Sequence, residues 1–408
     1  MVKDNTDFYE VKKPWSEIKD ALLACYLPEY FAKVLGAGKP ILYVDGFAGP
    51  GRFGDGSPGS PLIAWDAATH AILARKGSHK GVTFKFVEVQ HSRADTLHRT
   101  LAAHSDAVVS WDVLADNFTS SMTTLRSQIA SSKTFVYIDP FGIRDLSFAL
   151  FTDLGRHYMG DAELLINMNS FGFFRAACQA MKVSYAGDEA LDEDDPEIDD
   201  DMRGSTDPYS MLNSVAGGDY WQTIVNDYHR KLINGYEAER RFSEKYRQAL
   251  GKSFRFVTSM PLRLKEKNRP KYRMIHAANH EDGCVLMADN MMNRSQDLFI
   301  DFQRLGQSSL FGADQGVEGD VVMPQQLLDP LRQVIGSLTG EVPAHEVMAR
   351  FYAANGVICK TGKLNDALKQ LWENREFNAR WEPPLTKTGK PHQTFKPSSS
   401  LKVWIRHR

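Results

Sequence analysis

The chain has 408 residues, of which 42% are hydrophobic and 11% aromatic, and its formal net charge is −2. This length predicts two domains with ample apolar residues for a core. No apolar run approaches the roughly 18 residues of a membrane span and the first residues form no secretory segment, so we expect a cytoplasmic protein without membrane contact. The four cysteines stand far apart, which predicts reduced thiols and no metal site: Cys25, Cys178, Cys284 and Cys359.

The first predicted element is an amphipathic helical region, Pro14–Leu35, made of one helix or two. Its apolar residues recur at helical spacing, so it is expected to pack on a sheet. Trp15 and Lys19, near its start, either belong to this packing or border the mouth of a cofactor site.

A glycine-rich loop follows the predicted strand Ile41–Tyr43 and precedes a helix that starts near Pro61. Glycines let the backbone turn tightly and lie against a ligand, and a helix N-terminus offers unpaired N–H groups. The loop reads Val-Asp-Gly-Phe-Ala-Gly-Pro-Gly over residues 44–51. It predicts a cofactor site formed by Asp45, Gly46, Phe47, Ala48, Gly49 and Gly51.

Two cofactors compete for this loop. Nicotinamide enzymes usually carry Gly-x-Gly-x-x-Gly, which lets a pyrophosphate approach the helix. Here the spacing is Gly46-x-x-Gly49-x-Gly51, directly after Asp45. Asp45 would repel a pyrophosphate but could pair with the amino group of an amino-acid cofactor. We therefore favour S-adenosylmethionine, which has that amine and no phosphate, over NAD.

Further strands follow, separated by segments long enough for crossover helices. They are predicted at Val82–Val87, Ala107–Val109, Thr134–Ile138 and Ala162–Met168. This alternation predicts a parallel, doubly wound α/β sheet of the Rossmann type, whose ligands sit at the carboxyl ends of the strands.

Acidic residues follow three of these strands. Glu88 could accept hydrogen bonds from a ribose diol. Asp112 is expected to bond an adenine amine while Val113 packs on the ring. With Asp45 and Asp139, these acids are expected to gather at one edge of the sheet.

Asp139-Pro140-Phe141-Gly142 resembles the Asp-Pro-Pro-Tyr-like motif of methyltransferases that act on nucleobase amines. In this interpretation Asp139 and the Pro140 carbonyl orient the amine, and Phe141 stacks on a base that has left its stack. Positioning would supply most of the rate. Phe141-Gly142 departs from the motif, because a proline and an aromatic residue usually stand there. Asp-Pro is also ordinary turn chemistry, which is the structural alternative.

A strongly acidic segment interrupts the chain after the fifth strand. Between Asp188 and Arg203 there are ten acids and one arginine, so this segment carries −9 and the rest of the chain +7. We predict an insertion over about residues 180–215 that is a solvated loop, or else a nucleic-acid mimic or a gate over a basic groove. Its spacing matches no calcium loop.

Past Tyr220–Leu250, which predicts one or two helices, a basic hairpin is expected from Phe254–Leu264 and Lys271–Ala278. The hairpin could close the sheet. Its six positive charges favour a solvated face or a nucleic-acid contact equally. They are Arg263, Lys265, Lys267, Arg269, Lys271 and Arg273, of which Lys265, Lys267 and Arg269 form the predicted nucleic-acid surface.

A polar, glycine-rich linker is predicted at residues 306–322, between a domain of residues 1–305 and one of residues 323–408. Three helical patterns, Gln325–Leu338, Ala344–Ala354 and Lys363–Asn374, precede two strand patterns, Phe377–Glu382 and Leu401–Arg406. This order is typical of a winged helix. Its wing would carry Lys387, Lys390 and Lys396, with His392 and Phe395 among them, and would contact nucleic acid or a protein partner.

Several of these motifs together resemble the three-Cys-motif partner (TcmP) family. They are Trp15-Ser16-Glu17-Ile18-Lys19, the loop Asp45–Gly51, Gly59-Ser60-Pro61-Leu62, Asp139–Gly142, and Asn279-His280-x-x-Gly283 followed by Met287. The resemblance covers roughly residues 8–305. It implies a class I methyltransferase fold, often with a C-terminal winged helix, and a neighbouring protein with a three-cysteine cluster, plausibly a radical enzyme. It does not settle the substrate.

The sequence thus predicts a class I methyltransferase sheet followed by a small winged-helix domain. The predicted reaction is methyl transfer from S-adenosylmethionine to a nucleobase amine, in DNA rather than RNA. The main alternative is a cofactor-binding subunit that recruits a radical enzyme to nucleic acid. A methyltransferase for small molecules or proteins is a third possibility.

Overall fold

The structure is a computed structural model that describes residues 9–12, 14–75, 81–104, 109–157, 162–185, 207–263, 270–304, 324–386, 388–398 and 400–408. A seven-stranded sheet forms its centre, in the order β3-β2-β1-β4-β5-β7-β6. The strands are β1 (Ile41–Asp45), β2 (Val82–Val87), β3 (Ser110–Leu114), β4 (Lys133–Ile138), β5 (Ala162–Met168), β6 (Phe256–Arg263) and β7 (Pro270–Ala278). β1 to β5 are parallel, and β7 runs antiparallel to both β5 and β6.

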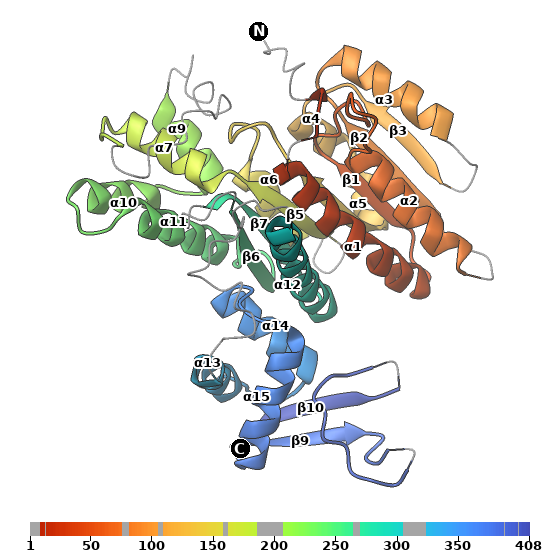
Figure 1. Cartoon of the computed structure of the whole chain (residues 1–408), viewed down its shortest axis with the longest axis vertical. Helices are drawn as coiled ribbons and strands as arrows, with labels where there is room; N and C mark the ends of the chain where they lie inside the picture. The colour runs from red at the N-terminus through yellow and green to blue at the C-terminus, as the bar shows by residue number, and fades with distance from the viewer. Residues whose placement is uncertain are drawn as a thin grey trace.

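Helices cover both faces of this sheet (Figure 1). One face packs against α1 (Pro14–Gly36), α2 (Ser60–Leu73), α3 (His91–His104) and α12 (Glu281–Arg304). The other packs against α4 (Phe118–Thr124), α5 (Arg126–Ser131), α6 (Phe148–His157), α7 (Ser170–Ala180), α9 (Pro208–Ala216), α10 (Tyr220–His229) and α11 (Gly235–Leu250). The central strands are buried on both sides, as expected for a parallel sheet, so the predicted mixed α/β, mostly parallel sheet is confirmed.

The C-terminal part has its own small antiparallel sheet, in the order β8-β10-β9. Its elements are α13 (Pro324–Gly336), β8 (Glu341–Pro343), α14 (Ala344–Asn355), α15 (Thr361–Glu373), β9 (Phe377–Glu382) and β10 (Lys402–His407). The three helices and two longer strands predicted here are confirmed, and β8 is an addition. The predicted linker at residues 306–322 lies outside the described residues.

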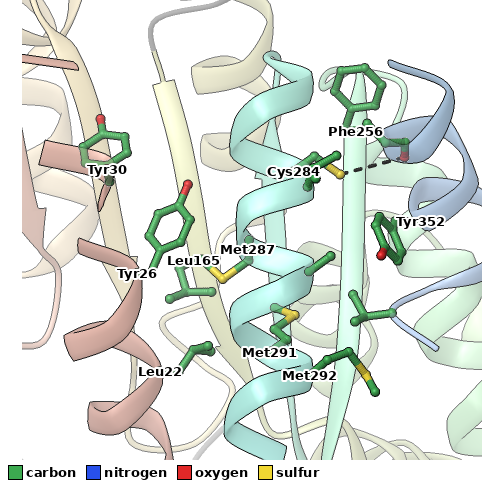
Figure 2. Packing of buried hydrophobic residues seen from close by; sticks show 14 of the residues in the cluster. Leu22, Tyr26, Tyr30, Leu165, Phe256, Cys284, Met287, Met291, Met292 and Tyr352 are labelled. Atoms are coloured by element: carbon green, nitrogen blue, oxygen red, sulfur yellow. Dashed lines mark hydrogen bonds between the residues drawn. The ribbon is translucent and has the colours of Figure 1, made fainter. Parts of the chain in front are cut away.

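One hydrophobic core runs from α1 into the C-terminal helices. Figure 2 shows Tyr26 of α1, Met287 and Met291 of α12, and Tyr352 of α14 around β5 and β6. A hydrogen bond also joins α11 to α14: Arg247 donates to the carbonyl of Ala354 (2.9 Å). The C-terminal part is therefore packed onto the sheet.

The structure describes only part of the two charged segments predicted from the sequence. The acidic run falls within residues 186–206, outside the described residues, but Pro208–Ala216 in the predicted insertion forms helix α9. Arg273, predicted on an exposed face of the hairpin, is mostly buried on β7, with 13% of its side chain exposed, and donates to Glu239 (2.6 and 2.9 Å). Its pairing with a buried acid of α11 is the reason why it does not face solvent.

Candidate functional site

The predicted glycine-rich loop lies across the carboxyl ends of β1, β2 and β4. Gly46 N–H donates to the carbonyl of Tyr137 (2.9 Å), and Ala48 N–H donates to that of Val87 (2.9 Å). These bonds tie the loop to the strands on either side of β1. The backbone that follows is therefore held at the ligand-binding edge of the sheet.

Two positions in the loop require glycine, because a side chain there would be strained and would clash. Gly49 and Gly51 have φ angles of +61° and +84°, where other residues are strained. A Cβ on Gly49 would lie 2.7 Å from the hydroxyl oxygen of Tyr9, and one on Gly51 would lie 2.7 Å from Leu97. Both positions are thus restricted to glycine by conformation and by space.

Asp45, the last residue of β1, is fully buried. Its Oδ1 accepts from Phe47 N–H (3.2 Å) and the Ser60 side chain also bonds the carboxylate, whereas Oδ2 has no partner among the described residues. Burial raises the pKa of Asp45 to about 7, the two hydrogen bonds act against this shift, and the charges of Asp139 and Asp20 add to it. A buried carboxylate with an unused acceptor position suits an ammonium group.

Glu88 follows β2 directly and is also buried. Its Oε2 accepts from Gly49 N–H (3.1 Å) and its Oε1 from Gln90 N–H (2.8 Å). Burial raises the pKa of Glu88, while these hydrogen bonds and the charge of Arg93 oppose the shift. Each oxygen has a second lone pair that a ligand hydroxyl could use.

Asp112 and Val113 do not lie where the sequence placed them. β3 spans Ser110–Leu114, so Asp112 stands in the middle of the strand and not after its end. Its half-exposed carboxylate lies 3.2 Å from Nζ of Lys85, the residue opposite it on β2. Val113 packs against the hydrophobic core. The pairing register with β2 fixes both positions, which corrects the strand predicted to end before Asp112.

Asp139 stands just past the end of β4 and is held from three sides. Lys19 Nζ lies 2.9 and 2.8 Å from its two carboxylate oxygens. Asn167 of β5 donates to Oδ1 (2.6 Å), and the Tyr137 hydroxyl donates more weakly to Oδ2 (3.4 Å). These four contacts match the roughly four acceptor positions of a carboxylate.

A cavity of about 60 Å³ opens beside Asp139. It joins the two motifs predicted from the sequence, because residues of the glycine loop and of Asp139–Phe141 line it together. Its lining is Tyr9, Ser16, Lys19, Asp20, Phe47, Ala48, Pro50, Gly51, Arg52, Phe53, Gly59, Ser60, Asp139, Pro140, Phe141, Asn167 and Tyr272. Gly142, with φ +83°, turns the chain away after Phe141.

Sequence reasoning missed several lining residues, among them Tyr9, Asp20, Asn167 and Tyr272. Lys19, considered only as a residue at a cofactor mouth or in core packing, also lies in the cavity. Its Nζ is 5.3 Å from the centre of the Tyr272 ring as well as bonded to Asp139. A usable signal existed, because Lys19 shares the inner stripe of α1 with apolar residues four positions away on each side.

Asp20 adds a second carboxylate from α1. It forms an ion pair with Lys12 (2.6 Å). Burial raises the pKa of Asp20 to about 6, although Lys12 and Lys19 lower it. The charged residues in the cavity lining are two acids, Asp20 and Asp139, and two bases, Lys19 and Arg52, so their formal charges balance.

Within the described ranges, no group of three or more His, Cys, Asp or Glu side chains could hold a metal ion. None of the described helices has the length and apolar character needed to cross a membrane.

No protein-family model and no curated protein matches the chain. Among solved structures it is similar to Trm1 from Pyrococcus horikoshii with S-adenosyl-L-methionine (8% identity, 100% of this chain and 93% of that one, TM-score 0.36). It is also similar to the cyclopropane synthase MmaA2 from Mycobacterium tuberculosis (11%, 69% and 72%, TM-score 0.25) and to loganic acid methyltransferase with SAH (10%, 76% and 89%, TM-score 0.26). Likenesses this weak carry no argument about function.

Proposed function

We propose that the chain is an S-adenosylmethionine-dependent methyltransferase acting on a nucleobase amine in nucleic acid, in DNA rather than RNA. One observation carries the proposal: the glycine loop after β1 and Asp139-Pro140-Phe141 after β4 line a single cavity. The strand order, with antiparallel β7 inserted between β5 and β6, is that of class I methyltransferases and supports the same assignment.

The residues around the loop fit the proposed cofactor. Oδ2 of buried Asp45, which has no partner in the part of the chain that the structure describes, would accept from its ammonium group, and Glu88 would accept from its ribose hydroxyls. Gly49 and Gly51 would let the backbone approach it closely. When bound, the cofactor would supply a methyl group on a sulfonium, which is a good leaving group.

On the target side, Asp139, the Pro140 carbonyl and Phe141 keep the roles proposed from the sequence. Asn167 adds a further acceptor, because its Oδ1 is buried in the cavity wall without a partner among the described residues. Lys19 Nζ and Asn167 Nδ2 both donate to Oδ1 of Asp139. The ammonium of Lys19, a donor, therefore lies close to the amide of Asn167, whose oxygen is an acceptor. Adenine and cytosine present the matching edge, a ring nitrogen beside an exocyclic amine.

Removing the Asp139 carboxylate is the first test of this reaction. Asp139→Ala is expected to lower the rate of labelled-methyl transfer to DNA by about 10²-fold or more, the usual effect of losing one group that orients the reacting atoms. The control, Asp153→Ala, removes an acid of α6 that pairs with Arg126 at the surface. A wild-type rate of methyl transfer by Asp139→Ala would show that Asp139 is not catalytic.

The C-terminal part is proposed to be a winged helix that holds nucleic acid. Lys390 and Lys396 are exposed on the segment between β9 and β10, whereas Lys387 lies outside the described residues. Phe395, expected on the wing, is instead buried against Trp372, Phe377 and Trp381, so it cannot stack on a base. The hairpin residues Lys265, Lys267 and Arg269 also lie outside the described residues and remain part of the proposal.

Replacing both Lys390 and Lys396 by alanine is expected to weaken binding of a labelled DNA duplex uniformly across sequences. Each lost phosphate contact should reduce the slope of log K against log salt by about 1. Fluorescence anisotropy over a salt series measures this slope, with Lys252→Ala, on the exposed turn after α11, as the control. An unchanged slope would show that this surface does not meet phosphates and would favour a protein partner there.

A second candidate function is a cofactor-binding subunit that recruits a radical enzyme, the three-cysteine partner implied by the TcmP resemblance. The ion pair of Asp139 with Lys19 favours it, because a carboxylate whose acceptor positions are filled can be purely structural. In that case the isolated chain would methylate neither DNA nor RNA. Nucleic-acid modification by the complex would then persist in Asp139→Ala.

A further inference from the structure

A short N-terminal segment, Tyr9–Lys12, crosses the glycine loop and is fastened to the chain around it. The carbonyl of Tyr9 accepts from Gly54 N–H (2.6 Å). Lys12 makes three attachments: its N–H donates to Asp55 (3.1 Å), its Nζ donates to the carbonyl of Pro58 (3.0 Å), and its Nζ pairs with Asp20 (2.6 Å). We call residues 9–12 the strap.

The strap places the ring of Tyr9 directly on the cofactor loop. The hydroxyl oxygen lies 2.7 Å from where a Cβ of Gly49 would be. The guanidinium of Arg93 lies over the ring, 4.7 Å from its centre. The centres of the Tyr9 and Phe141 rings are 5.8 Å apart, and the two rings are nearly perpendicular. Burial, followed by the charge of Glu88, raises the pKa of the Tyr9 hydroxyl. Tyr9 is therefore packed into the site between the loop and the acid after β2.

This position is the one that a bound nucleoside would need. Gly49 and Glu88 are joined by a hydrogen bond of 3.1 Å, so a ribose held by Glu88 must lie against the backbone of Gly49. The phenol ring lies against that same backbone. The cavity of about 60 Å³ is lined by Tyr9 but by neither Gly49 nor Glu88, and it is far smaller than the roughly 300 Å³ at which pockets for whole ligands begin.

We propose that Tyr9 is a built-in occupant of the nucleoside half of the cofactor site, and that the strap must leave the loop before the cofactor binds. That the cofactor is S-adenosylmethionine rests on the proposed function. The displacement of Tyr9 does not, because any nucleoside held by Glu88 and Gly49 meets the same ring. Arg93 would then be released from Tyr9 and could face the ligand.

Such an occupant lowers the apparent affinity by the fraction of molecules in which the strap is open. If about one molecule in ten is open, removing the ring should tighten binding about tenfold. Tyr9→Ala removes the ring, and Tyr9→Phe keeps it. Lys12→Ala leaves the ring but cuts the attachments of the strap, so it should shift affinity in the same direction as Tyr9→Ala.

The test has two arms, of which the first needs no cofactor. Ala48, in the loop and in the cavity lining, is only 5% exposed. Cys25→Ser removes the one cysteine that is not buried and leaves Cys178, Cys284 and Cys359. In this background, Ala48→Cys introduces a thiol in the loop. The rate at which this thiol reacts with a maleimide reports on access to the loop. We expect Tyr9→Ala and Lys12→Ala to speed this labelling by about tenfold or more, and Tyr9→Phe and Tyr209→Ala, which removes an exposed tyrosine of α9, to leave it unchanged.

The second arm is calorimetric titration of the full chain with S-adenosylmethionine. Tighter binding by Tyr9→Ala than by wild type supports the proposal, and weaker binding overturns it, because Tyr9 would then be a contact of the cofactor. Labelling that Tyr9→Ala and Lys12→Ala leave unchanged also overturns it. Faster labelling without binding of S-adenosylmethionine by any variant keeps the strap proposal and removes the proposed cofactor.

Discussion

Glu239→Ala is expected to lower the free energy of unfolding by about 3–5 kcal/mol, the usual cost of leaving one partner of a buried ion pair alone. Glu239 of α11 is buried and accepts from Arg273 of β7 and from the hydroxyls of Ser170 (2.6 Å) and Ser243 (2.9 Å). Without it, the Arg273 guanidinium would keep its charge in a mostly buried position and lose its hydrogen-bonded carboxylate. Chemical denaturation followed by circular dichroism measures the loss.

The pH dependence of this cluster follows from the same contacts. Burial alone would raise the pKa of Glu239, but Arg273 and the two hydroxyls outweigh it and lower the pKa. A lowered pKa gives stability that is complete above the usual carboxyl range and is lost as the pH falls through the folded-state pKa. The control is Glu244→Ala, an exposed acid of the same helix that pairs with Arg240 and should cost less than about 1 kcal/mol. Equal losses in the two variants would refute the prediction.

Asp45→Asn is expected to stabilise the fold at alkaline pH while abolishing cofactor binding. Burial raises the pKa of Asp45 from 3.8 to about 7, so its ionisation is costly in the folded state. The stability that Asp45 contributes is complete below about pH 3.8 and is lost as the pH rises through 7. One pKa unit corresponds to about 1.4 kcal/mol, so the variant should gain a few kcal/mol over wild type at pH 8.

Unfolding of both proteins at pH 4 and pH 8 tests this directly. The stabilisation should nearly vanish at the lower pH, where wild-type Asp45 is protonated. Glu244→Gln, an acid of α11 that pairs with Arg240, is the control and should show no such trend, because arginine keeps its charge at both pH values. A difference between Asp45→Asn and wild type that does not change with pH would mean that Asp45 ionises freely in the fold. If Asp45→Asn gains stability but loses binding of the cofactor, the carboxylate of Asp45 serves binding and lowers the stability of the fold.

Much of the sheet could be predicted because each parallel strand is a short apolar run between turn signals. Four of the five predicted parallel strands, at Ile41, Val82, Thr134 and Ala162, lie within a residue or two of the observed ones. The antiparallel hairpin was also predicted correctly. Local sequence decides these elements, since burial on both faces leaves little room for polar residues.

The wrong predictions concern residues whose positions depend on partners that are distant in the sequence. Asp112 was placed after a strand because the apolar residues before it are the better strand formers, but β2 pairs with the residues from Ser110 onwards. Arg273 looked like one of a row of surface charges. Its partner, Glu239, lies 34 residues earlier on helix α11, and no periodicity links the two.

The candidate site shows the same division. The loop at Asp45 and the motif at Asp139 could be found from the sequence, because each is a compact signal at a strand end. Asn167 and Tyr9 could not be assigned, and the bond from Lys19 to Asp139 could not be foreseen, because these residues come to Asp139 and Gly49 through the packing of α1, β5 and the strap. Their roles depend on three-dimensional neighbours that are distant in the chain.

The shared core between α12 and α14 has a consequence for how a long polymer would be handled. Because the described part of the C-terminal region shares buried side chains with the sheet, packing sets the separation of its basic face from the cavity at Asp139. A strand gripped at Lys390 and Lys396 would then reach the cavity only at one set interval along its length. Under the proposed function, the protein would therefore select its target by distance along the strand as well as by the chemistry of the base.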